Sequence, residues 1–127
     1  MDEQVVLSVS QQDYLREIYV LSLENEKVRV TDVATVLGIS KASVNRAVNV
    51  LKEAGYLEHE HYGTLRLTET GCTTAKNIYD NYKVVYRFLT DVLGVDIITA
   101  EEEAHRIEHD IGRGTRKKLK KYMKKKK

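Results

Sequence analysis

The segment from residue 31 to residue 56 constrains the fold more than any other part of the chain, because a glycine separates two apolar-periodic runs. Thr31 is a good N-cap for a first helix, and Gly38 can take the left-handed conformation that ends it. Ser40 then predicts the start of a longer helix, and Gly55 its end. A short helix, a tight turn and a longer helix form the helix-turn-helix pattern.

The longer helix has two faces. One face is apolar and predicts a buried stripe, with residues at i, i+3, i+4 and i+7: Val44, Ala47, Val48 and Leu51. Another face carries two amides and a guanidinium, from Asn45, Arg46 and Asn49. Arginine bonds guanine edges and asparagine bonds adenine edges. A solvated polar face is the usual interpretation for an isolated helix, but the caps, the glycine turn and the following segment favour DNA binding.

The following segment predicts a β-hairpin. Residues 56–60 and 64–68 alternate apolar and polar side chains, and Gly63 lies in the short turn between them. Residues 28–30 form a third strand candidate that could pair with the hairpin. We therefore predict a mostly α fold that begins with a winged helix-turn-helix DNA-binding domain. The recognition helix of such a domain enters the major groove.

The net charge of +2 hides a strong asymmetry. Residues 113–127 hold ten of the 21 basic residues and no acid, so the other 112 residues, with 11 basic and 19 acidic side chains, carry −8. Residues 27–66 carry +2, whereas residues 80–110 carry −5. An acidic cluster in a DNA-binding protein repels phosphate, and a bound cation would neutralise it.

Composition also indicates a cytoplasmic protein without a membrane partner. Cys72 is the single cysteine, so an intrachain disulfide is impossible. The chain begins without the basic and apolar regions of a signal peptide, and its apolar runs are too short to span a bilayer.

Further helices flank the winged helix. We predict a first helix from a Ser10–Asp13 capping pair to about Leu23. A long helix is predicted to start at Thr68 and to end at Gly94. The winged-helix domain is accordingly assigned to residues 1–72, and an α-helical dimerisation and metal-binding domain to residues 73–127.

The second domain is predicted to contain one more helix and a basic tail. A capping box of Thr99 and Glu102 opens a helix that runs to about Ile111, where glycines break it. Residues 115–127 could be helical near Leu119 and Tyr122, and beyond them we expect a lysine-rich tail. It is either a solvated segment or a nonspecific phosphate contact that steepens the salt dependence of DNA binding.

A metal-site pattern lies in the predicted helix before this tail. His105, Glu108 and His109 occupy i, i+3 and i+4, so two imidazoles and a carboxylate share one helical face. Such a set suits borderline divalent metals, although an exposed polar stripe explains the pattern equally well. The same letters match the inverzincin metalloprotease signature. An enzyme is disfavoured, because it needs a further ligand and a cleft, and about half of the chain forms the winged helix.

Several segments, in this order and spacing, resemble the diphtheria toxin repressor family of metal-dependent transcription regulators. The resemblance runs without a gap from about residue 12 to residue 112 and rests on Asp13–Tyr19, Gly55–Leu57, Leu67–Gly71, Phe88–Val95 and Glu108–His109. The resemblance implies a homodimer of winged helices joined by helical domains, in a short form without the SH3-like third domain. It also implies that metal binding between the first helix and the helical domain sets the geometry for DNA.

The resemblance places the principal metal site on Asp13, His105, Glu108 and His109. Two histidines and two carboxylates fit Mn²⁺ or Fe²⁺, and would bind Co²⁺ or Zn²⁺ in vitro. Two positions depart from the family. His105 stands where cysteine or glutamate is usual, and Arg16 stands where the manganese-responsive branch has a glutamate ligand.

The family's second metal site has tyrosines at two ligand positions, Tyr82 and Tyr86. We expect these rings to pack together or to hydrogen-bond Glu101, which leaves one functional metal per chain. The alternative is a rearranged secondary site that recruits Glu101, Glu102 or Asp80.

The function predicted from all of this is a metal-activated repressor of metal-uptake genes, with a double-stranded DNA operator as partner and no small-molecule substrate. Residues expected to face bases are Ser40, Ala42, Ser43, Asn45, Arg46 and Asn49, and those expected to contact the DNA backbone are Thr31, Lys41, Lys52 and Tyr62. The alternatives are a winged-helix regulator that responds to a non-metal signal or a protein partner, and a metallohydrolase.

Overall fold

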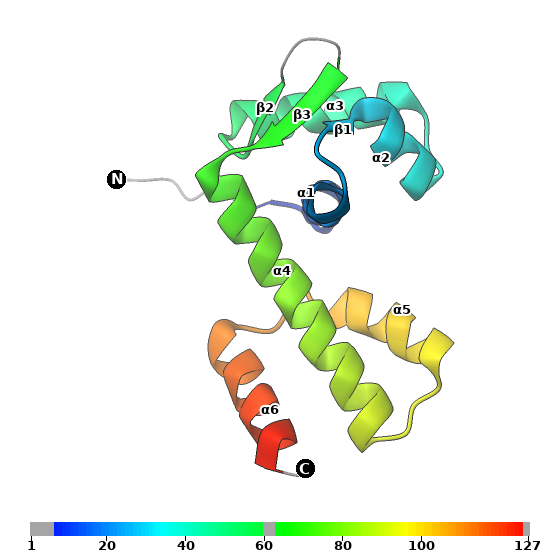
Figure 1. The fold of residues 1–127 in the computed structure, drawn as a ribbon, viewed down its shortest axis with the longest axis vertical. Helices are drawn as coiled ribbons and strands as arrows, with labels where there is room; N and C mark the ends of the chain where they lie inside the picture. The colour runs from blue at the N-terminus through cyan, green and yellow to red at the C-terminus, as the bar shows by residue number, and fades with distance from the viewer. Residues whose placement is uncertain (1–6, 60–62, 126–127) are drawn as a thin grey trace. The chain divides into compact units, whose positions relative to one another are not determined.

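The computed structural model describes residues 7–59 and 63–125. The chain divides into two compact units, residues 1–76 and residues 77–127, which are described separately below (Figure 1). The domain boundary predicted from the sequence, between residues 72 and 73, lies four residues before this division.

The first unit is a winged helix. Its helices are α1 (Val9–Glu24), α2 (Val30–Leu37), α3 (Lys41–Glu53) and the start of α4 (Glu69–Arg87), and its strands are β1 (Val28–Arg29), β2 (Leu57–His59) and β3 (Thr64–Leu67). The strands form one antiparallel sheet in the order β1-β3-β2. Val28 pairs with Leu65, and Leu57 pairs with Leu67. The predicted hairpin and its pairing with residues 28–30 are therefore confirmed.

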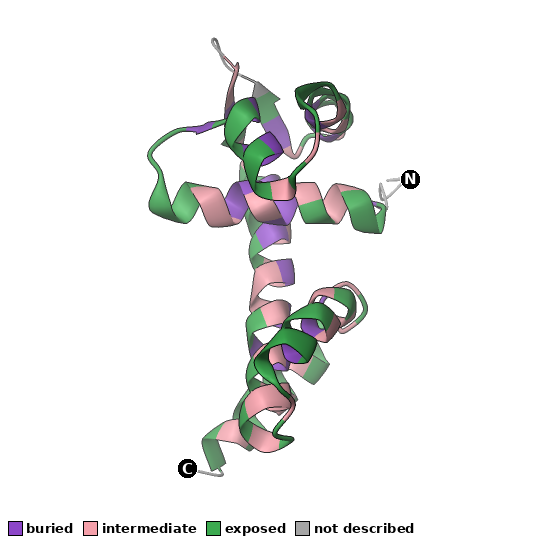
Figure 2. Cartoon of the chain, turned by 90° about the vertical axis from the view of Figure 1, so that its right-hand side faces the viewer, coloured by how far each residue is buried: buried purple, intermediate pink, exposed green. Residues whose placement is uncertain are grey.

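The core of the first unit is formed by apolar stripes on three helices (Figure 2). The predicted stripe of α3 is confirmed for Val44, Val48 and Leu51, each of which is completely buried, whereas Ala47 is half-buried. Buried residues of α1 and α2 join this core, with Leu15, Ile18, Tyr19, Val33 and Ala34, and the strands add Val28, Leu57 and Leu65. Side chains at period 3.6 on each helix can therefore be buried together, while the opposite faces stay in water.

Two of the predicted helix starts in the first unit are wrong. The N-cap of α1 is Ser8 rather than Ser10, because the Ser8 hydroxyl accepts from the Gln11 backbone N–H, and the Gln11 amide oxygen accepts from the Ser8 N–H. Thr31 lies inside α2, and the N-cap of this helix is Arg29. The backbone N–H of Arg29 donates to the Asp32 carboxylate at 2.8 Å.

The other predicted boundaries of the helix-turn-helix are confirmed. Gly38 has φ +66° after α2, and Gly55 has φ +86° after α3, so both use the left-handed region that other residues avoid. The Ser40 hydroxyl accepts from the Ser43 N–H at 3.1 Å and caps α3. Thr68 likewise caps α4, because its hydroxyl accepts from the Gly71 N–H.

The second unit consists of the C-terminal part of α4, its direct continuation, and two further helices that pack against them. The α4 helix continues into a π-helical turn, η2 (Phe88–Val92), and is followed by α5 (Ile97–Ile107) and α6 (Arg113–Lys125). Gly94 ends the α4–η2 segment with φ +69°, as predicted. The core contains Ile78, Val84, Val85, Ala100 and Ala104.

Both predicted ends of α5 are corrected by the structure. The N-cap is Asp96 rather than Thr99, and the N–H of Thr99 donates to the Asp96 carboxylate at 3.0 Å. This bond holds the pKa of the Asp96 carboxyl below its ordinary value. The helix ends at Ile107, not near Ile111. Residues 113–125 form a helix that includes Gly114, so the helical structure expected near Leu119 and Tyr122 is confirmed and extends to Lys125.

No helix among the described residues is both long and apolar enough to cross a bilayer.

Candidate nucleic-acid interface and metal centre

The exposed face of α3 carries most of the residues predicted to contact DNA. Ala42, Asn45, Arg46 and Asn49 are exposed along this helix, as are its two lysines, Lys41 and Lys52, while Ser43 is half-buried. Burial of Val44, Val48 and Leu51 fixes which side of α3 faces outward. The amides and the guanidinium are consequently available to a ligand rather than used in the core.

A short hydrogen-bond chain orders the N-terminal turn of α3. The Ser40 hydroxyl donates to the Ser43 hydroxyl at 3.0 Å, and Arg46 Nη2 donates to the same Ser43 oxygen at 3.2 Å. The guanidinium therefore lies along the helix toward its N-terminus. The first turn of a recognition helix is where base contacts are made in helix-turn-helix proteins.

Two of the predicted backbone contacts lie outside α3. Thr31 is exposed on α2. Tyr62, in the turn of the wing, lies outside the described residues, so its predicted role stays a prediction. Gly63 directly after it has φ +74°, as the hairpin turn requires.

At the end of α5 the structure brings together two of the predicted metal ligands. His105 Nδ1 lies 2.9 Å from Glu108 Oε1. The Glu108 side chain is completely buried, whereas the His105 side chain is 43% exposed. A buried carboxylate requires a cationic or hydrogen-bonding neighbour, and an imidazole with one nitrogen turned to a carboxylate is a typical metal-binding arrangement. These residues therefore fit a divalent cation chemically.

The other two predicted ligands are not tested by this geometry. His109 lies in the turn after α5, next to Glu108, the C-cap. Asp13 is exposed on α1 in the first unit. Within residues 7–59 and 63–125, no group of three or more histidine, cysteine, aspartate or glutamate side chains is gathered closely enough to hold a metal. The four-residue ligand set stays a prediction.

Aromatic packing surrounds His105. Its ring stacks on Tyr82 with centroids 4.4 Å apart, and Tyr82 stacks on Tyr86 at 5.9 Å. The expected packing of the two tyrosines is thus confirmed, and the contact with His105 is additional. Glu101 and Glu102, proposed for a secondary site, are both exposed on α5. Arg16 is buried, and its Nη1 donates to Glu17 at 3.3 Å.

The residue that hydrogen-bonds the backbone of the turn after α5 was not predicted from the sequence. Asn81 on α4 is buried, and its amide donates to the carbonyl oxygens of Glu108 and Ile111, both at 3.0 Å. Its amide oxygen accepts from Arg116 Nη1 at 3.1 Å. A signal was present, because Asn81 lies between Ile78 and Val85 at helical spacing, where a polar residue interrupts a buried stripe.

Comparison with known proteins gives two matching family models. The model described as "Iron dependent repressor, N-terminal DNA binding domain" matches residues 6–65. The model described as "Iron dependent repressor, metal binding and dimerisation domain" matches residues 68–127.

Individual proteins agree with these models. The chain is 37% identical over 120 residues to the uncharacterized HTH-type transcriptional regulator MJ0568 of Methanocaldococcus jannaschii, covering 94% of this chain and 96% of that relative. It is 33% identical over 102 residues to the HTH-type transcriptional regulator MntR of Shouchella clausii, covering 80% of this chain and 71% of MntR.

The solved structure of the manganese regulator SloR superposes with a TM-score of 0.77 at 25% identity, covering 90% of this chain and 53% of SloR. The chain thus spans about half the length of that solved protein. The resemblance drawn from the sequence is confirmed by these matches. The chain belongs to the iron-dependent repressor family, which combines a DNA-binding domain with a metal-binding and dimerisation domain.

Proposed function

We propose that this chain acts as a homodimeric, metal-activated repressor that binds a double-stranded DNA operator and controls metal-uptake genes. The observation that carries the metal dependence is the buried Glu108 carboxylate 2.9 Å from the His105 imidazole. The exposed amides and guanidinium of α3 support operator binding. Such a repressor would act in the cytoplasm and would lack enzymatic activity.

We assign the metal ligands to Asp13, His105, Glu108 and His109. A divalent cation held there would supply positive charge beside a buried carboxylate. When Nδ1 of His105 carries the proton, it donates to Glu108, and the Nε2 lone pair is left to serve as a ligand. Asp13 belongs to the first unit and the other three residues to the second, so shared coordination would link the two units.

Mn²⁺ or Fe²⁺ is the proposed physiological metal. A donor set of imidazole and carboxylate without sulfur suits both ions, and Co²⁺ or Zn²⁺ would bind in vitro. Similarity to the manganese regulator SloR supports manganese. The tyrosine stack of Tyr82 and Tyr86 supports one metal per chain.

Calorimetric titration of anaerobic, metal-free protein with Mn²⁺, Fe²⁺ and Co²⁺ tests the metal assignment. We expect one site per chain in the wild type, loss of that site in His109→Ala, and weaker binding in Asp13→Ala. Asp91→Ala is the matched control, because it removes an exposed carboxylate of the second unit that belongs to neither the principal nor the secondary candidate site. Absence of metal binding in the wild type would refute the proposed function, and two sites per chain would refute the single-site assignment.

DNA binding is tested with a duplex selected from a random-sequence pool in the presence of Mn²⁺. Coupling between metal and DNA sites is typically about 1–3 kcal/mol, so Mn²⁺ should tighten binding by about 5- to 150-fold. Arg46→Ala should reduce the preference for the selected duplex over a scrambled one. An equal loss of affinity for both duplexes would show that Arg46 does not read bases.

A further inference from the structure

The most basic segment of the chain is a helix. The described part of it, α6, spans residues 113–125 and contains eight basic side chains and no acidic one. Like charges at i and i+4 destabilise an isolated helix, and no acid within α6 offsets this repulsion. A polyanion bound along the helix would remove it.

Contacts with the rest of the second unit hold α6 in place. Arg116 Nη1 donates to the Asn77 carbonyl at 3.2 Å and to Asn81 Oδ1 at 3.1 Å. The ring of Tyr122 meets Phe88 of η2 in an edge contact, with centroids 6.2 Å apart. Leu119 is half-buried on the same side. These contacts lie on one face of α6, which is partly covered because Tyr122 stays 44% exposed, and they fix the direction of the other face.

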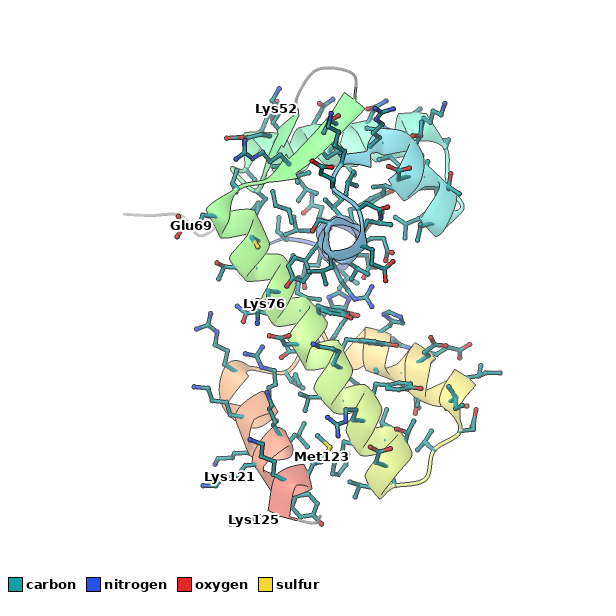
Figure 3. All side chains as sticks on the ribbon, viewed as in Figure 1. Lys52, Glu69, Lys76, Lys121, Met123 and Lys125 are labelled. Carbon is teal, nitrogen blue, oxygen red and sulfur yellow. The ribbon has the colours of Figure 1, made fainter. Side chains whose placement is uncertain are left out.

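The outward face carries four lysines, Lys117, Lys121, Lys124 and Lys125, which we call the lysine ridge. They lie at i, i+4, i+7 and i+8, on the side of the helix opposite Leu119, and all four are exposed. In Figure 3, Lys121 and Lys125 project away from α4, whereas Met123 points toward it. At a rise of 1.5 Å per residue, the ridge spans about 12 Å, which matches about three to four phosphate steps of one DNA strand.

We propose that the lysine ridge binds the phosphate backbone of double-stranded DNA and adds a sequence-independent contact to that of the winged helix. This inference rests on the proposed operator binding, which brings DNA to the protein. We expect the lysine ridge to increase the affinity for DNA and the salt dependence of binding, but not the sequence preference, because phosphates are common to all sequences.

The packing of α6 favours DNA over an acidic membrane surface. A helix that lies in a membrane interface inserts an apolar face between lipids. In α6 the residues of that face contact the second unit: Tyr122 meets Phe88, and Leu119 is half-buried. The ridge itself offers ammonium groups on flexible stems, which act as point charges for phosphate.

The test measures DNA affinity against salt concentration. A fluorescein-labelled 30-base-pair duplex of scrambled sequence is titrated with Mn²⁺-loaded protein at several KCl concentrations, and binding is followed by fluorescence anisotropy. The ridge-Gln variant carries Lys→Gln at all four ridge positions. A ridge-Arg variant keeps the charge at the same positions. An off-ridge variant loses four charges elsewhere, with Gln at Lys27, Lys76, Lys83 and Arg87.

Each lysine that neutralises a phosphate contributes about 0.9 to the slope of log K against log salt concentration. The slope of the ridge-Gln variant should therefore be less steep than the wild-type slope by up to about 3.6 per chain. We expect the ridge-Arg slope to equal that of the wild type, and the off-ridge slope to change by less than about 1. Circular dichroism at 222 nm checks that each variant is folded.

Several results would overturn the inference. An unchanged slope in the ridge-Gln variant, with wild-type DNA binding intact, would reject the ridge contact and leave the proposed function standing. Failure of the wild type to bind any duplex would reject both. Cosedimentation with vesicles of 70% phosphatidylcholine and 30% phosphatidylglycerol, lost in the ridge-Gln variant while the DNA slope is unchanged, would assign the ridge to lipid. Loss of dimerisation in the same variant would assign it to a second copy of the chain.

Discussion

Replacing Asn81 with alanine removes the amide that ties the turn after α5 to α4 and α6. The side chain makes three hydrogen bonds of 3.0–3.1 Å, two donated to the carbonyls of Glu108 and Ile111 and one accepted from Arg116. These partners are 27, 30 and 35 residues away in the chain, so each bond connects separate elements.

The expected loss of stability follows from these contacts. A hydrogen bond contributes a net of about 1 kcal/mol, and a buried polar group left without its partner costs about 1–3 kcal/mol. Arg116 keeps its bond to the Asn77 carbonyl, which limits the loss on that side. We expect Asn81→Ala to lower the free energy of unfolding by about 2–4 kcal/mol, a large part of the roughly 5–15 kcal/mol of a typical domain.

Urea unfolding of metal-free protein, followed by circular dichroism at one fixed protein concentration, measures this change. Asn77→Ala is the matched control on the same helix. The Asn77 side chain accepts one longer bond, at 3.4 Å, and its carbonyl survives the substitution. The control should therefore lose less than about 1 kcal/mol.

The same variant tests the link between this turn and metal binding. Residues that orient metal ligands typically change affinity by about 10- to 100-fold when they are removed. Asn81→Ala should weaken Co²⁺ binding by about that factor in a calorimetric titration, with Asn77→Ala close to the wild type. Equal stability losses in both variants, or a wild-type Co²⁺ affinity in Asn81→Ala, would refute the role given to Asn81.

Three further predictions concern local structure. Gly71→Ala should destabilise the winged helix severely in urea unfolding, because the added Cβ would clash with the Tyr56 carbonyl oxygen. Gly114→Ala instead meets open space on α6 and should stabilise by about 0.4–1 kcal/mol. Asp96 caps α5, and the backbone N–H of Thr99 is the main cause that lowers the pKa of its carboxyl. The contribution of this cap to folding stability is therefore complete above about pH 4 and is lost as the pH falls through the lowered pKa. Asp96→Asn should remove this part of the pH dependence of the melting temperature. Ser40→Ala should lower the stability of the first unit by about 1 kcal/mol, measured by urea unfolding, because α3 loses its N-cap.

Each of these predictions has a contrary result. Equal stability of the two glycine variants would show that the backbone near Tyr56 relaxes freely. An unchanged pH profile in Asp96→Asn would mean that other carboxylates dominate acid unfolding. A neutral Ser40→Ala, compared with the off-cap control Ser22→Ala, would mean that water replaces the cap at no cost.

Short-range chemistry made the winged helix predictable. The αL turn at Gly38, the cap at Ser40 and the buried stripe from Val44 to Leu51 each depend on residues within a few positions of one another. Backbone sterics, first-turn hydrogen bonding and helical periodicity act over that distance, so sequence is enough. The misplaced start of α1 is of the same local kind, because two nearby serines compete and the Gln11 side chain favours Ser8.

The second unit shows where tertiary structure decides. The amphipathic pattern from residue 97 onward could have continued past Ile107, but the carbonyls of Glu108 and Ile111 bond to Asn81 instead. The lysine-rich segment was expected to be helical near Leu119 and Tyr122 and a tail beyond them, whereas α6 runs to Lys125, and Arg116 bonds it to α4. The sequence by itself thus determined the helix-turn-helix, the wing and the identity of the candidate ligands. Only the fold decided that His105 of α5 stacks on Tyr82 of α4, because contacts between separate elements form only when the chain brings them together.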